Sequence, residues 1–159
     1  MTKALPGRHS MYCFVPGDED IVITPHFKAG EFKCNSGNWP WLIAATLVEK
    51  LEDMRILIKR SLVITSGYRT PEYNASIGGA KESRHIFGLA ADLDIPTEMD
   101  WLALSGLAYF VGFRRIGVSR SYIHVDIDID EAYWRYNDVL AQLSLGDLIQ
   151  KAAKRWGQL

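Results

Sequence analysis

The chain has few cysteines and no long apolar run. Its 159 residues include only Cys13 and Cys34, which is too few for the disulfide framework of a small secreted domain. The sequence leaves open whether these two thiols pair or stay reduced, and it disfavours them as zinc ligands because neither belongs to a CxxC-type pair. No run of 18 apolar residues exists, so we expect no membrane span.

The chain also has no excess of charge of either sign. The 18 Lys and Arg residues nearly balance the 19 Asp and Glu residues, and the net charge of −1 gives no electrostatic case for a nucleic-acid partner. Residues 1–11 lack the apolar core of a secretory signal. We therefore expect a protein made in the cytoplasm without a signal peptide, so that a substrate outside the membrane would require a separate export route.

What is present fits one globular domain over residues 1–159. The hydrophobic fraction of 48% is ordinary for a soluble chain of this length, and we expect a monomer. Residues 1–20 are rich in Gly, Pro and charge and predict an irregular arm. Hydrophobic periodicity predicts helices at 39–60 and 101–111, a helical tail from about residue 131 that is broken near 144–146, and strands at 61–66, 89–95, 115–118 and 122–129. This pattern predicts an α+β fold, with helices packed on one small, mainly antiparallel sheet.

The most informative stretch is residues 83–92, which places His85 and Asp92 seven residues apart. His124 follows about thirty residues later in an alternating strand pattern that puts Asp126 on the same face. Two imidazoles and one carboxylate are a complete protein ligand set for one catalytic zinc ion, with a fourth position left open. The residues alone therefore predict a zinc site on the sheet and a zinc hydrolase.

This pattern resembles the zinc signature of peptidase family M15. The family comprises D-alanyl-D-alanine carboxypeptidases and murein endopeptidases, which share a metal-site fold with the hedgehog signalling domain. The resemblance covers about residues 27–135. The stretches that carry it are residues 27–34, 64–71, 78–80 and 83–92, together with Asn74 and residues 124–126.

The resemblance implies a role for each matching residue. His85, Asp92 and His124 match the zinc ligands. Arg69 matches an arginine that binds the substrate carbonyl or the oxyanion, for which a permanently charged guanidinium is suited; the alternative is a surface ion pair. Ser83 matches a serine that contacts the substrate or orients His85, and the alternative is a turn or cap serine.

The general base is the position where the sequence departs from the family. Many members place a Glu three residues before the last His, or a His two residues before it. Here those positions are Ser121 and Tyr122. Asp126 shares the strand face of His124 and is the predicted catalytic substitute. The alternative is that Asp126 fixes the imidazole of a ligand histidine.

The resemblance implies a zinc metallopeptidase that hydrolyses the peptide stem of bacterial peptidoglycan. An endolysin-like enzyme that reaches the periplasm or cell wall through a holin-type pore or a dedicated exporter fits the small size. The favoured bond is L-Ala–D-Glu, cut as an endopeptidase. The alternatives are a D-Ala-D-Ala carboxypeptidase, a non-catalytic zinc or cell-wall-binding module, and a cytosolic peptidase of small peptides. A groove open at both ends would indicate the endopeptidase.

Overall fold

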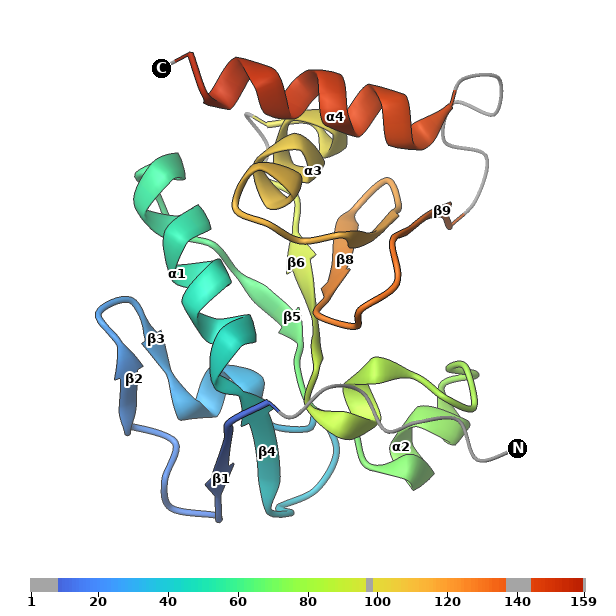
Figure 1. The fold of residues 1–159 in the computed structure, drawn as a ribbon. Coiled ribbons are helices and arrows are strands. Elements are labelled where there is room, and N and C mark those ends of the chain that lie inside the picture. The colour runs from blue at the N-terminus through green and yellow to red at the C-terminus, as the bar shows by residue number, and fades with distance from the viewer. Residues whose placement is uncertain (1–8, 97–98, 137–143, 159) are drawn as a thin grey trace.

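A five-stranded sheet forms the centre of the protein (Figure 1). The computed structural model describes residues 9–96, 99–136 and 144–158. The strands of the sheet lie in the order β5-β6-β8-β7-β9. They are β5 (Ile64–Ser66), β6 (Ala90–Asp94), β7 (Arg115–Val118), β8 (Tyr122–Asp126) and β9 (Ala132–Arg135). All neighbours are antiparallel except β7 and β9, which are parallel.

Alternation along β6 and β8 separates the two faces of the sheet. Leu93, Ile123 and Val125 are fully buried in the hydrophobic core. On this side α3 (Trp101–Phe110) packs on β7 and β8, and α1 (Ala45–Ile58) packs on α3. The intervening residues of β6 and β8 point to the other face, so one face of the sheet is left for polar side chains.

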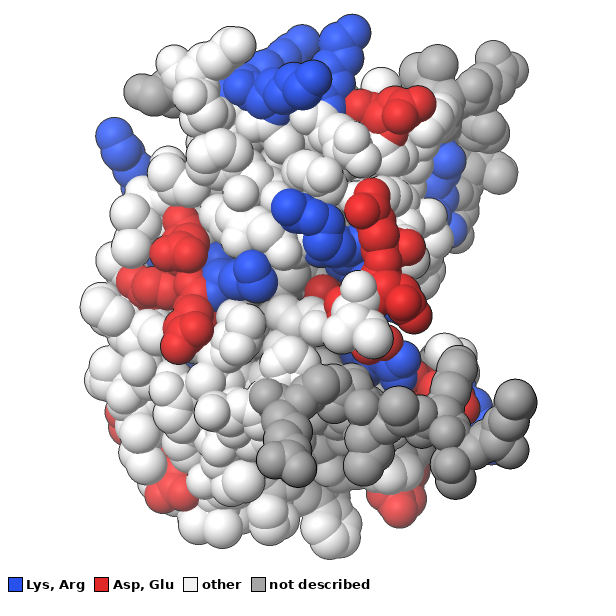
Figure 2. Space-filling model, in the orientation of Figure 1, with Lys and Arg blue, Asp and Glu red and all other residues white. Residues whose placement is uncertain are grey.

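Two further helices complete the fold. α4 (Leu145–Trp156) lies across α3 and reaches β9, and its Lys and Arg residues gather on the surface at the top of Figure 2. α2 (Pro71–Ser76) begins at a proline, and the Thr70 hydroxyl before it accepts a hydrogen bond from the backbone N–H of Tyr73. No helix among the described residues is long and apolar enough to cross a membrane.

The first part of the chain forms two small antiparallel sheets beside α1. One pairs β1 (Met11–Phe14) with β4 (Trp41–Ala44), and the other pairs β2 (Val22–Thr24) with β3 (Phe27–Lys28). There are also two short 3-10 helices: η1 (Ala29–Phe32) lies between β3 and β4, and η2 (Arg84–Phe87) lies between α2 and β6. The predicted α+β class is confirmed.

Three sequence-based predictions were wrong for the same reason. The helix predicted from residue 39 begins at Ala45, because residues 41–44 form a strand that pairs with β1. The arm predicted to be irregular over residues 1–20 contains β1 itself. The helical tail predicted from about residue 131 contains β9, because those residues pair with β7. Pairing with distant segments decided each case, and local periodicity does not report it. Residues 137–143 lie outside the described part, and α4 begins beside the predicted break.

Gly88 follows η2 and contacts β4, where its carbonyl oxygen accepts the backbone N–H of Ala44, so it gives a test of this packing. It has a φ of +67°, and a Cβ there would lie 2.4 Å from the carbonyl oxygen of Leu42. We expect Gly88→Ala to lower the free energy of unfolding by about 2–3 kcal/mol in urea titrations. Gly78→Ala is the matched control, since its φ is +71° with nothing within 4 Å, and it should lose about 1 kcal/mol. Equal losses would show that the contact with Leu42 is unimportant.

Candidate metal centre

Three buried side chains converge on the polar face of the sheet. His85 comes from η2, Asp92 from β6 and His124 from β8, and one ligand atom of each lies within 4.8 Å of the others. Asp92 and His124 are direct cross-strand partners, so the ladder itself places them side by side on one face. The three residues predicted as ligands from the sequence are therefore brought together in one cluster that could hold a metal ion.

In each imidazole, one nitrogen faces the cluster and the other contacts a neighbouring oxygen. The contact of the outer nitrogen determines the tautomer. His85 Nδ1 lies 2.6 Å from the carbonyl oxygen of Gly67, which can only accept, so Nδ1 carries the hydrogen and Nε2 faces the cluster with a lone pair. His124 Nε2 lies 3.1 Å from the carboxylate of Asp126, and when this ring is neutral its Nδ1 faces the cluster in the same way. This is the arrangement that metal-binding histidines require.

The donor atoms are spaced as ligands of one ion. His85 Nε2 lies 3.1 Å from His124 Nδ1 and 3.2 Å from Asp92 Oδ1, and the last two atoms lie 2.9 Å apart. Ligands of a tetrahedral zinc ion lie roughly 3.3–3.6 Å apart. Without a cation between them, two lone pairs and a carboxylate would repel one another. The donor set and its spacing therefore fit a divalent metal.

The titration properties of the cluster point the same way. Burial lowers the pKa of His85 and keeps that ring neutral. Burial opposes charge on Asp92 and His124 as well. The hydrogen bonds that His124 donates, from Nδ1 to Asp92 and from Nε2 to Asp126, outweigh burial, so the pKa of Asp92 falls and that of His124 rises. A positive charge is favoured at this point, either as a proton or as a metal ion in its place.

Arg69 is bound to the cluster. Its Nη2 donates to Asp92 Oδ2 at 2.5 Å, and its Nε donates to the hydroxyl of Ser66 at 2.8 Å. Ser66 and Asp92 are partners across β5 and β6, so the guanidinium of Arg69 spans these two neighbouring strands. The sequence-predicted arginine therefore lies at the site and contacts a candidate ligand.

Asp126 lies behind His124, where it is 1% exposed. One carboxylate oxygen faces His124 Nε2, and the other lies 2.9 Å from Arg115 Nε and accepts the backbone N–H of Asp128 at 3.1 Å. The ring of His124 thus separates this carboxylate from the other candidate ligands. These contacts are those of a group that orients an imidazole.

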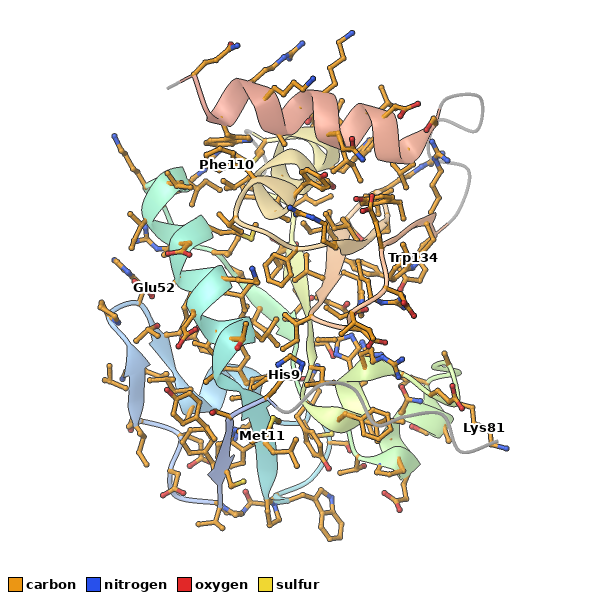
Figure 3. The ribbon with its side chains drawn as sticks, viewed as in Figure 1. His9, Met11, Glu52, Lys81, Phe110 and Trp134 are labelled. Carbon is orange, nitrogen blue, oxygen red and sulfur yellow. The ribbon has the colours of Figure 1, made fainter. Side chains whose placement is uncertain are left out.

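A row of residues runs across the sheet through the cluster. From Asp92 on β6 the cross-strand partners are His124 on β8, Gly117 on β7 and Trp134 on β9. A Cβ on Gly117 would lie 2.5 Å from the Trp134 ring, so the indole occupies the space above this glycine. It reaches His124, with ring centroids 5.2 Å apart, and Figure 3 shows Trp134 on the side of the sheet away from α1.

Two cavities flank His124. One of about 430 Å³ is lined by Arg84, Arg115 and several carboxylates, and the other, of about 320 Å³, is lined by Arg69, all three residues of the cluster, Tyr122 and Tyr136. Ser83, His124 and Tyr136 line both. Ser83 precedes η2, makes no side-chain cap to that helix, and is partly exposed.

Sequence reasoning missed the residues that close the site from β9. Trp134 and Tyr136 fall in the tail that was predicted to be helical. The available signal was the aromatic-rich run at residues 133–136, which is typical of a strand. Tyr136 packs on both Tyr122 and Trp134, with ring centroids 5.5 and 6.2 Å apart. Burial raises the pKa of Tyr136 to about 12.

Comparison with known proteins identifies the family. The sequence model of the family described as Peptidase M15 matches residues 25–128, which is more than half of the chain. The chain therefore belongs to peptidase family M15, and the predicted membership is confirmed. All residues of the cluster, with Arg69, Ser83 and Asp126, lie inside the matched range, whereas β9 lies outside it. A search of curated proteins found no match.

Metal binding can be measured directly. We expect the purified protein to retain one zinc ion per chain after dialysis, measured by mass spectrometry of the metal. His85→Ala and His124→Ala should each lose it, because two ligands seldom hold zinc. His26→Ala is the matched control: His26 Nδ1 contacts Glu52 Oε1 at 2.6 Å on α1, across the molecule from Trp134 (Figure 3). Stoichiometric zinc in both cluster variants would contradict this assignment.

Proposed function

We propose that the protein is a zinc peptidase that cuts the peptide stem of bacterial peptidoglycan. The observation that carries the proposal is the convergence of His85, Asp92 and His124, with a lone pair or carboxylate oxygen of each turned inward, in a chain of peptidase family M15. Zinc held there would supply a Lewis acid that polarises the scissile carbonyl and activates water. Arg69 donates to Asp92 and orients this carboxylate, and it lines the smaller cavity, where a guanidinium can bind a substrate carbonyl.

The favoured reaction is endopeptidase cleavage of L-Ala–D-Glu. The two cavities on either side of His124 share Ser83 and Tyr136, which supports a groove with room for substrate on both sides of the scissile bond. A D-Ala-D-Ala carboxypeptidase needs little space beyond the leaving residue. With this substrate we propose an endolysin-like role at the periplasm or cell wall, reached through a holin-type pore or an exporter.

Mass spectrometry of digested peptidoglycan tests the function. Sacculi incubated with the zinc-loaded protein should release fragments cut at L-Ala–D-Glu, and a chelator or the His124→Ala change should abolish them. Release of single D-Ala would instead identify a carboxypeptidase. Cleavage of free dipeptides but not of sacculi would identify a small-peptide hydrolase. No product from a zinc-containing protein would favour the cell-wall-binding module.

The role of Asp126 can be decided by an isosteric change. Its contacts support a positioning role: Asp126 accepts the His124 Nε2 hydrogen and thereby presents Nδ1 to the metal. On this proposal Asp126→Asn weakens zinc affinity and lowers activity, each by about 10–100-fold. As the general base, which the sequence predicted, the same change would keep zinc affinity and lower kcat by more than about 10²-fold. Zinc titration and kinetics on a synthetic stem peptide separate the two.

A further inference from the structure

The charged groups at the site are largely committed to one another. Arg69 donates to Ser66 and Asp92, and Arg115 lies against Asp126. A peptidase needs hydrogen-bond donors aimed at the carbonyl oxygen, where negative charge develops during attack. The side chains of the smaller cavity that carry a neutral donor are the tyrosines Tyr122 and Tyr136, with Ser83 at its edge.

The Tyr136 ring is held by a neighbouring aromatic ring. It lies edge to face with the Trp134 indole, with ring centroids 6.2 Å apart and planes at 78°. The Tyr136 hydroxyl can both donate and accept a hydrogen bond. That hydroxyl belongs to a residue lining the same cavity as His85, Asp92 and His124.

The backbone holds Tyr136 in this place. Its N–H donates to the carbonyl oxygen of Val118 at 2.7 Å, which continues the pairing of β9 with β7 by one residue. Because side chains alternate along a strand, Tyr136 shares the face of Trp134, two residues before it. The ring packs against Tyr122 on β8 at 5.5 Å between centroids, so a wall of three aromatic residues borders the candidate metal centre.

We propose that Tyr136 is a further catalytic residue, whose hydroxyl donates a hydrogen bond to the oxygen of the scissile carbonyl and to the oxyanion that forms from it. Trp134 is the positioning residue that packs against the Tyr136 ring, and Gly117 provides the space in which the indole lies. The inference rests on the proposed peptidase function. It places the donor on the residue that follows β9, outside residues 25–128 that the family match covers.

Tyr136→Phe removes the hydroxyl and keeps the ring. We expect kcat/KM on a synthetic stem peptide to fall about 10²-fold, mainly in kcat, because the bond strengthens as the oxyanion forms. Zinc content and thermal midpoint should match the wild type. Tyr133→Phe is the matched control on the same strand, since the Tyr133 hydroxyl donates to Glu131 at 2.7 Å and does not line the cavity. It should retain wild-type kinetics.

A second measurement uses binding instead of turnover. A phosphinate analogue of the L-Ala–D-Glu unit carries a tetrahedral anion like the one that Tyr136 is proposed to contact. Calorimetry on the zinc-loaded proteins should show about 10²-fold weaker binding to Tyr136→Phe, whereas Tyr133→Phe should bind as the wild type does. Loss of turnover with unchanged phosphinate affinity would assign Tyr136 to another step and overturn the inference.

The outcomes separate this inference from the proposed function. Suppose that the wild-type protein cleaves peptidoglycan and that kcat/KM of Tyr136→Phe lies within about threefold of the wild-type value. This result would overturn the role of Tyr136 and leave the proposed function standing. Phosphinate binding that depends on Tyr136, without cleavage of peptidoglycan, would keep the role of Tyr136 and overturn the substrate. A wild-type protein that neither cleaves nor binds would overturn both.

Discussion

The rest of the site depends on the meeting of His85 Nε2, His124 Nδ1 and Asp92 Oδ1 at separations of 2.9–3.2 Å. When both rings are neutral these atoms are three acceptors, and buried acceptors that face one another without a cation are costly. The protein accepts this arrangement because each imidazole is fixed from behind, His85 by the Gly67 carbonyl and His124 by Asp126. The surrounding contacts therefore prepare a place for a cation, which removes the repulsion.

The strand register of the sheet determines how close Asp92 and His124 lie to each other. Asp92 and His124 are cross-strand partners, and a one-residue slip of either strand would turn that strand's candidate ligand toward the hydrophobic core. The buried apolar residues between them oppose such a shift, because they fill the space under α3. The same alternation that buries the core residues therefore positions Asp92 and His124. One register of β6 and β8 serves both the hydrophobic core and the candidate metal centre.

The cluster of candidate ligands could be predicted from the sequence, whereas the aromatic wall could not. His85, Asp92 and His124 lie in short motifs whose alternation and spacing carry the information locally. Trp134 and Tyr136 reach the site only because β9 pairs in parallel with β7, a contact between segments that enclose β8. Gly117 shows the same limit: its importance comes from an indole on another strand, and nothing beside it in the sequence marks it.

The charges around the centre explain why neutral donors suit this site. Asp92 is balanced by Arg69, Asp126 by Arg115, and Asp128 by Arg84, whose Nε donates to it at 2.6 Å. A divalent ion added to this set keeps most of its positive charge, since the nearby carboxylates are already paired. A positive ion of this kind stabilises an oxyanion, so a protonated phenol can add direction where a further arginine would add repulsion.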